Sequence, residues 1–188
     1  MPAARSRREE LAEAATDHAL RNGLIGLSLR PLAAAIGTSD RMLLYHFRDK
    51  EDLVATVLRV AGDQAVAEVA ALPVVPGVRA AVLALWQASS DGLLERCQRL
   101  YLQAAALGLL GQEPYVSVVR EANERWDAAL ATHLCRAGCP EARARRAALL
   151  LDAGFMGLHL DLPVDGDEPA VGQAVADLAT AVEAIATS

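Results

Sequence analysis

Apolar residues recur along this chain at intervals of three and four positions, which is the spacing of one face of an α-helix. Near the start, two such stripes flank a single glycine, Gly37. Glycine adopts left-handed backbone conformations without a Cβ clash, so Gly37 is expected to end the first helix. The pattern therefore predicts helix, tight turn and helix over residues 28–50. The two stripes are formed by Leu32, Ala33 and Ile36 and by Leu43 and Phe47.

Polar residues precede both of these short helices. Ser28 can cap the first helix by accepting a backbone N–H, and Thr38 or Ser39 can cap the second. Pro31 falls in the first turn, where a missing N–H matters little. A short helix, a glycine turn and a second helix with polar residues at its start can place a recognition helix in the DNA major groove. An ordinary pair of packed helices fits the same pattern, so both interpretations stay open at this point.

The same periodicity predicts helices through the rest of the chain. One is expected over residues 8–21, after a loose arm or tail over residues 1–7, and another over 50–71. Two prolines and a glycine in residues 72–77 mark the clearest break. Alanine and leucine dominate and aromatic residues are scarce, so we expect an all-α protein of about nine helices. The later helices are expected over 78–90, 93–110, 114–137, 141–161 and 169–187.

Charge divides the chain into two unlike parts. The net charge of −6 by itself argues against a nucleic-acid partner. Residues 1–59, however, carry nine Lys and Arg against eight Asp and Glu, whereas the remainder carries nine against sixteen. The first part is therefore the one that can approach phosphate, and binding there must rest on a few well-placed cations. Lys50 is the only lysine in the chain.

The cysteines and the lengths of the apolar runs indicate the cellular compartment and whether a membrane span or a metal site is expected. Cys97, Cys135 and Cys139 are few and odd in number, which fits a reducing cytoplasm better than a disulfide scaffold. No apolar run reaches the roughly 18 residues that a membrane span requires, and the charged N-terminus is unlike a secretory signal. His133 lies near two of the cysteines, but a helix break interrupts this set and no fourth ligand follows. We therefore expect no metal site, no cofactor and no membrane partner.

A longer set of residues keeps a fixed order and spacing across the predicted turn. It consists of Leu29, Arg30, Leu32, Ala33, Ile36, Gly37, Thr38 and Ser39, followed by Leu43, Tyr45, His46, Phe47, Lys50 and Leu53. From about Arg8 to Leu58 the chain resembles, without a gap, the DNA-binding region of the tetracycline-repressor (TetR) family. Leu44 departs from the family, which usually has an aromatic residue at this position. Tyr45 is the residue that could make that ring's contact instead.

The resemblance implies an organisation for the whole chain. Residues 1–50 would form a helix-turn-helix DNA-binding domain, and the helix from about residue 50 would bridge to a helical ligand-binding and dimerisation domain over 51–188. A homodimer formed through the last two helices would bind a palindromic operator. A small molecule would then release the DNA.

The second motif helix is expected to supply most of the DNA contacts. Arg41 is our candidate for guanine, because its guanidinium can bond O6 and N7 together, and Leu44 suits a thymine methyl. Asp40 could accept from a cytosine amino group or cap the helix, and we favour the cap. Arg30 is a second base reader by resemblance. The other DNA-facing residues are Ser39 at the outward start of the helix and, as phosphate contacts, Ser28, Met42 through its backbone, Tyr45, His46 and Lys50.

Polar and aromatic residues on otherwise apolar helix faces are the candidates for a ligand site in the second part. Each could instead be a core residue, and Trp86, Tyr101 and Trp126 are of types found more often in a core than in a pocket. Asp152 and His159 could line a pocket or pair across a dimer seam, and the sequence leaves both open. The few charges on inner faces suggest a mostly apolar effector. The candidates are Trp86, Tyr101, Asn123, Trp126, His133, Asp152, Phe155 and His159.

Two functions other than a DNA-binding regulator are open to an all-α chain of this length. An all-helical enzyme is disfavoured, because no catalytic set, phosphate loop or metal motif has the required spacing. A helical interaction module with a degenerate DNA motif is kept as an alternative by the near-neutral first part and by Leu44. We therefore expect a regulator, most often a repressor in this family, and not an enzyme.

Overall fold

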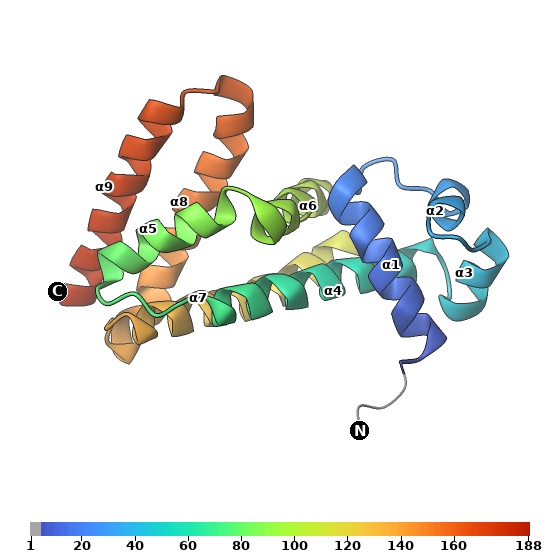
Figure 1. Cartoon of the computed structure of the whole chain (residues 1–188), viewed down its shortest axis with the longest axis horizontal. Coiled ribbons are helices and arrows are strands. Elements are labelled where there is room, and N and C mark those ends of the chain that lie inside the picture. The colour runs from blue at the N-terminus through green and yellow to red at the C-terminus, as the bar shows by residue number, and fades with distance from the viewer. Residues whose placement is uncertain (1–4) are drawn as a thin grey trace. The chain divides into compact units, whose positions relative to one another are not determined.

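The computed structural model describes residues 5–188, with the backbone alone over 161–165. This part of the chain forms nine α-helices and no strands, as the sequence pattern predicts (Figure 1). The helices are α1 Arg7–Asn22, α2 Leu29–Ala35, α3 Asp40–His46, α4 Lys50–Ala71, α5 Val78–Ser89, α6 Gly92–Leu109, α7 Tyr115–Arg136, α8 Glu141–Asp165 and α9 Glu168–Thr187.

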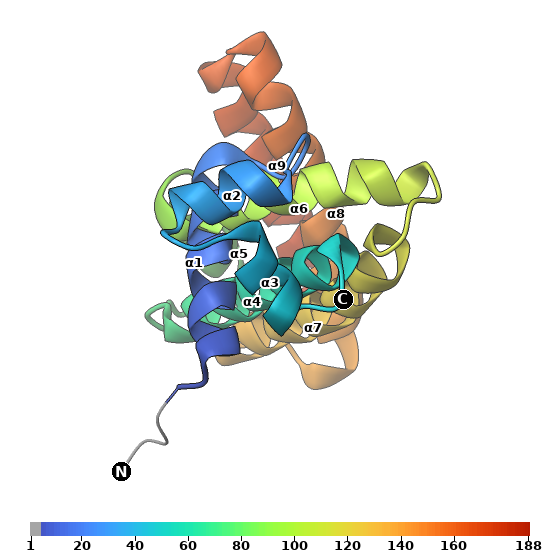
Figure 2. The ribbon, with the colours of Figure 1, turned by 90° about the vertical axis from the view of Figure 1, so that its right-hand side faces the viewer.

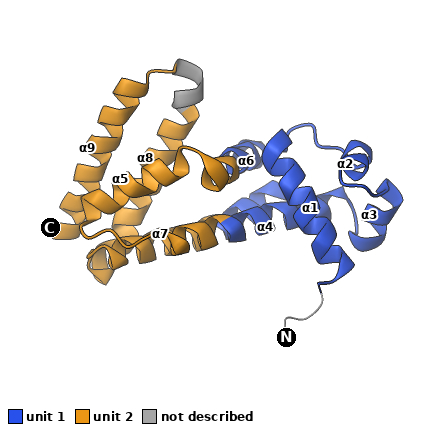
Figure 3. Ribbon diagram, in the orientation of Figure 1, with its two compact units in different colours: residues 1–64, 99–122 blue, residues 65–98, 123–188 orange. Residues whose placement is uncertain are grey.

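The helices fall into two compact units that alternate along the chain (Figure 3). Unit 1 comprises residues 1–64 and 99–122, and unit 2 comprises residues 65–98 and 123–188. The long helices α4, α6 and α7 each contribute residues to both units. Unit 1 thus joins the predicted helix-turn-helix to segments that lie far away in sequence.

A capping box sets the beginning of α1. The Ser6 hydroxyl accepts the backbone N–H of Glu9, and the Glu9 carboxylate accepts the backbone N–H of Ser6. These reciprocal bonds satisfy two amides that a helix start leaves without partners. The expectation of a loose arm through residue 7 is therefore wrong at its last residues, because the helix is already capped at Ser6.

The turn between α2 and α3 forms as predicted. Gly37 has a φ of +71°, in the left-handed region that favours glycine. Ser39 is the N-cap of α3 and accepts the Met42 N–H at 3.2 Å. The preference for Asp40 as the cap is wrong: Asp40 is the first helical residue, and its carboxylate accepts the neighbouring Arg41 N–H at 2.9 Å.

Ser28 occupies the N-cap position of α2 but does not act as predicted. Its side chain makes no cap hydrogen bond. An N-cap side chain accepts the N–H of the second or third helical residue, and here the third is Pro31, which has none. Pro31 suits the first turn, but it removes one of the two backbone N–H groups from which the Ser28 side chain could accept a hydrogen bond.

The first three helices share a hydrophobic core, to which the inner side of α3 contributes. Leu32, Leu43 and Phe47 are buried as predicted, whereas Ile36 is half-buried. The helices α1, α2 and α3 pack against one another. We call these three helices the α1–α3 head. Their buried sides leave the outer side of α3 in solvent.

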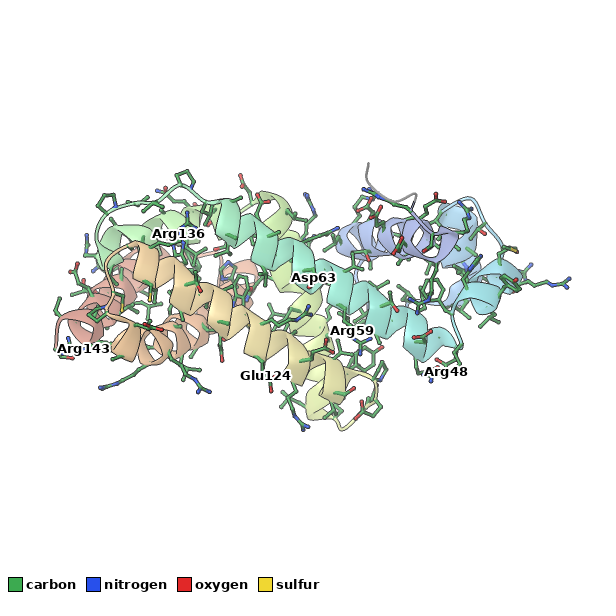
Figure 4. The ribbon with its side chains drawn as sticks, turned by 90° about the horizontal axis from the view of Figure 1, so that it is seen from below. Arg48, Arg59, Asp63, Glu124, Arg136 and Arg143 are labelled. Carbon is green, nitrogen blue, oxygen red and sulfur yellow. The ribbon has the colours of Figure 1, made fainter. Side chains whose placement is uncertain are left out.

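In unit 2, α8 and α9 lie side by side and α5 packs on α9 (Figure 1). Gly154 of α8 allows the close approach, because an added Cβ would collide with Leu178 of α9. Two arginines, which Figure 4 labels, donate to carbonyls at the C-terminal ends of other helices, where carbonyls lack helical partners. Arg136 donates to the carbonyls of Ala70 and Leu72, and Arg143 donates to that of the α9 residue Ala186.

Candidate DNA-binding and ligand sites

The outer side of α3 carries Arg41 and Leu44, which the sequence assigned to base reading, and Tyr45, which it assigned to phosphate. Arg41, Leu44 and Tyr45 are all exposed, and Tyr45 is exposed to 79%. Leu43, on the opposite side of this helix, is fully buried. Figure 2 views α2 and α3 from this end of unit 1. A seven-residue helix held by one buried leucine thus presents a mixed cationic, apolar and aromatic surface.

The remaining DNA candidates differ in exposure. Ser28, Arg30, Ser39, Asp40 and Met42 are exposed, whereas His46 and Lys50 are half-buried. The Tyr45 and His46 rings meet edge to face, with centroids 5.0 Å apart. The hydrophobic contact of Leu44 with DNA remains a prediction, and its 49% exposure leaves the side chain accessible for it.

Ion pairing separates the cations of unit 1 into two groups. Among the residues that the structure describes, Arg30, Arg41 and Lys50 form no ion pair. The paired arginines are Arg5 with Glu13, Arg7 with Glu10, Arg8 with Asp52, Arg48 with Asp49, and Arg59 with Glu121. Figure 4 labels Arg48 and Arg59. Arg21 and Arg120 of the same unit also form no ion pair with any described residue, so the lack of a partner does not single out the DNA candidates. It does leave the charges of Arg30, Arg41 and Lys50 available to phosphate or base.

Arg8 ties the α1–α3 head to the start of α4. Its Nε donates to the His46 carbonyl at 3.1 Å, and its guanidinium lies 4.7 Å from the centre of the Phe47 ring. An ion pair with Asp52 at 3.2 Å completes the contact. The sequence gives no local signal for this role of Arg8, because its partners His46 and Asp52 lie 38 and 44 positions away.

Gln103 of α6 holds the loop between α1 and α2 within unit 1. Its side-chain oxygen accepts the backbone N–H of Leu24 at 2.7 Å and that of Ile25 at 3.0 Å. These residues are 79 and 78 positions away in sequence, so no local pattern predicts the pair. One amide oxygen thereby fixes the chain just before the helix-turn-helix.

In unit 2, three of the ligand candidates form an aromatic cluster. The Trp86 ring lies 5.1 Å from that of Phe155 and 4.5 Å from that of His159, measured between centroids. Both ring nitrogens of His159 lie near carbonyl oxygens: Nδ1 is 2.8 Å from that of Phe155 and Nε2 is 3.1 Å from that of Ser89, and a neutral ring donates to one of the two. We call Trp86, Phe155 and His159 the α5–α8 aromatic cluster.

A second pair of candidates lies on α7 and α8. The Trp126 indole N–H donates to the Asp152 carboxylate at 2.8 Å. Burial raises the pKa of Asp152, while the bond from Trp126 opposes that shift and the nearby Asp127 charge adds to it. Asp152 thus keeps a hydrogen bond within its own chain.

The other ligand candidates lie in different surroundings. His133 is buried, its Nε2 is 3.3 Å from the Ala81 carbonyl oxygen, and burial lowers its pKa. This is the environment of a core histidine. Tyr101 is half-buried in the part of α6 that belongs to unit 1, and Asn123 is exposed on α7.

Burial of the cysteine thiols argues against a thiol switch. Burial raises the pKa of Cys97 to about 11, and it also raises that of Cys139. Since the thiolate is the reactive form, both sulfurs are less reactive than a free cysteine at neutral pH. Among the described residues, no group of three or more His, Cys, Asp or Glu side chains could hold a metal ion.

Comparison with known proteins agrees with this geometry. Residues 11–57 match the family model described as bacterial regulatory proteins, tetR family. No curated protein sequence matches the chain significantly. Among solved structures, a transcriptional regulator from Rhodococcus sp. Rha1 shares 25% identity, with a TM-score of 0.73 over 94% of this chain and 96% of that one.

Two further solved structures share the fold. A TetR transcriptional regulator from Legionella pneumophila has 17% identity and a TM-score of 0.72, over 96% of this chain and 99% of that one. A transcriptional regulator from Saccharomonospora viridis, solved in complex with choline, has 22% identity and a TM-score of 0.66, over 94% and 95% of the two chains.

The helix-turn-helix, its exposed α3 surface and the helical remainder define a DNA-binding transcriptional regulator, which is a class of proteins that are not enzymes. Residues 11–57 match the N-terminal region of the tetR family of bacterial regulatory proteins, and the whole described chain has the fold of solved transcriptional regulators. Within the described residues, no helix combines the length and the apolar character that crossing a membrane requires.

Lys50→Ala should weaken DNA binding equally on all sequences, because an ammonium group at phosphate carries no base information. Each phosphate contact contributes about one unit to the slope of log affinity against log salt, so this slope should flatten by about one. Titrations of one operator at several salt concentrations measure it. Arg48→Ala is the control, since Arg48 is already paired with Asp49. An unchanged slope for Lys50→Ala would show that Lys50 is an ordinary surface charge.

Proposed function

We propose that this protein is a cytoplasmic, homodimeric repressor that binds a palindromic operator and is released by a small, mostly apolar effector. The observation that carries the proposal is the outer side of α3. It combines the exposed side chains of Arg41, Leu44 and Tyr45 with cations that no acidic partner neutralises among the described residues. Phosphate contacts would come from Lys50 and its neighbours, and base contacts from Arg41, Leu44 and Arg30.

The surface of α8 supports association with a second copy of the chain. Exposed residues of small or apolar character recur along one side of this helix at helical spacing, and Leu149, Leu150 and Leu160 are exposed to 50%, 37% and 58%. We call this surface the α8 stripe; its members are Leu149, Leu150, Ala153, Gly157 and Leu160. Gly157 has open space where a Cβ would stand, so another helix could approach closely there. Contact between two equal stripes would give a two-fold dimer.

The proposed dimer sets the geometry of DNA recognition. A two-fold dimer of helix-turn-helix domains binds two half-sites in successive major grooves, about 34–36 Å apart. An effector releases the DNA only if it binds the non-binding conformation better, and such couplings typically amount to about 1–3 kcal/mol. The choline-bound Saccharomonospora viridis protein, which has the same fold, supports a small-molecule effector for this chain.

The proposed function is tested by selecting bound sequences from random DNA and measuring Arg41→Ala on the selected site. Arg41→Ala should relax preference at one base pair and weaken binding to that site by about 1–3 kcal/mol. Arg48→Ala, which removes a paired cation, should leave base preference unchanged. Equal weakening of Arg41→Ala on all sequences would assign Arg41 to phosphate. Failure to select any palindrome would contradict the proposed function itself.

A further inference from the structure

Asp152 is a carboxylate in partly apolar surroundings. It lies half-buried on α8, and its described hydrogen bond comes from the Trp126 indole. Among the residues that the structure describes, no cationic side chain lies within ion-pair distance of it. Burial without a cation disfavours the charged carboxylate, and this is the cause of its raised pKa.

The surroundings of Asp152 add negative potential. Asp127, next to Trp126 on α7, acts on Asp152 as a second negative charge. The two carboxylates therefore leave a local excess of negative charge in unit 2. A positive group would relieve it, because an opposite charge within about 4–6 Å stabilises a buried carboxylate.

Aromatic rings lie on the same side of α8 as this carboxylate. Phe155 and His159 follow Asp152 by three and seven residues, which is one helix face. Both belong to the α5–α8 aromatic cluster with Trp86. The α8 stripe adjoins this face, since Leu149 precedes Asp152 by three residues, and the hydrogen bond from Trp126 shows that the Asp152 carboxylate is turned toward α7.

This combination matches the chemistry of a small organic cation. The faces of Trp and Phe rings attract ammonium groups, and quaternary ammonium ligands are bound by such rings. Alkyl groups around the nitrogen would also suit the apolar surroundings. We propose that the effector site of this protein takes a small organic cation, with its nitrogen against Asp152 and its alkyl groups against Trp126 and the α5–α8 aromatic cluster. This inference rests on the proposed effector-released regulator and names its ligand class.

The test uses the full-length protein and its own fluorescence. The chain has two tryptophans, Trp86 and Trp126, and both belong to the site. Choline is the cationic probe, and 3,3-dimethylbutan-1-ol is its neutral analogue with carbon in place of nitrogen. Choline should change the fluorescence with saturation, and the neutral analogue should bind at least about tenfold more weakly.

Asp152→Asn tests the carboxylate directly. The amide oxygen can still accept from the Trp126 indole, so the variant removes charge and keeps the hydrogen bond. Choline affinity should fall about tenfold or more, with binding of the neutral analogue unchanged. Asp177→Asn is the matched control, because it removes an exposed carboxylate of the same unit. The comparison of the two ligands on the unaltered protein stands even if Asp152→Asn folds poorly.

Three results would overturn the inference: equal affinity for choline and its neutral analogue, undiminished choline binding by Asp152→Asn, or no fluorescence change with choline up to about 50 mM. A parallel titration with operator DNA distinguishes failure of the proposed ligand class from failure of the proposed DNA-binding function. Operator binding without choline binding would remove the ligand class and leave the regulator intact. Choline binding by a protein that selects no operator would support the ligand class and contradict the proposed regulator.

Discussion

Leu149→Glu should convert the proposed dimer to a monomer. Leu149 is half exposed on the α8 stripe, and two-fold symmetry would place it in the interface of both copies. Full burial of a leucine contributes about 1.5–3 kcal/mol, and Leu149 has only half of its surface left to bury, so the two copies together contribute about 1.5–3 kcal/mol. A glutamate in the interface adds the cost of burying two unpaired carboxylates. The dimer dissociation constant should rise at least about a hundredfold, as measured by analytical ultracentrifugation over a dilution series.

Dissociation of the dimer should also weaken binding to the full palindromic operator. A monomer would contact one half-site, so the affinity for the full palindrome should fall steeply while affinity for an isolated half-site stays the same. Leu109→Glu is the matched control, because Leu109 is exposed to 89% on α6 and lies outside the α8 stripe. A dimer that survives Leu149→Glu, or dissociates equally with Leu109→Glu, would place the interface elsewhere.

Gly23→Ala should loosen the α1–α3 head more than Gly26→Ala does. Gly23 has φ +86° and ψ 176°, a region that is essentially restricted to glycine and costs other residues about 1–3 kcal/mol. An added Cβ would also stand 3.0 Å from the Gln103 side-chain oxygen, which accepts the loop amides. Gly26 has a similar φ of +80°, but open space surrounds its Cβ position. Gly26→Ala therefore controls for a substitution at positive φ in the same loop, and Gln103→Leu identifies the part that is due to Gln103.

The readouts are amide exchange and operator affinity. Gly23→Ala should increase hydrogen exchange at Leu24 and Ile25 and lower operator affinity about tenfold, since an unsatisfied buried amide costs about 1–3 kcal/mol. Gln103→Leu should reproduce both effects, because it removes the acceptor and leaves both glycines in place. Identical exchange at these two amides in both glycine variants would show that Gln103 does not hold the loop.

The amino-acid pattern determined the helices and the exposed outer side of α3. The capped turn at Gly37 and Ser39, the bounds of α4 and the buried side of α3 all depend on residues within a few positions of each other. Short-range hydrogen bonding and helical periodicity decide such features, and a single sequence contains both. Ser28 shows the limit, because its capping depended on a donor that Pro31 removes.

Tertiary structure alone decided the contacts between distant segments. Gln103 accepts from amides almost eighty residues away, and Arg8 of α1 pairs with Asp52 of α4. Neither contact has a sequence signature. The side to which Asp152 and His159 turn also stayed open until their hydrogen bonds to Trp126 and Ser89 were seen. Helix periodicity gives the angle of a side chain around its own helix, but it does not say which helix packs against that side. Packing of the whole chain decides that, and with it which polar side chains meet.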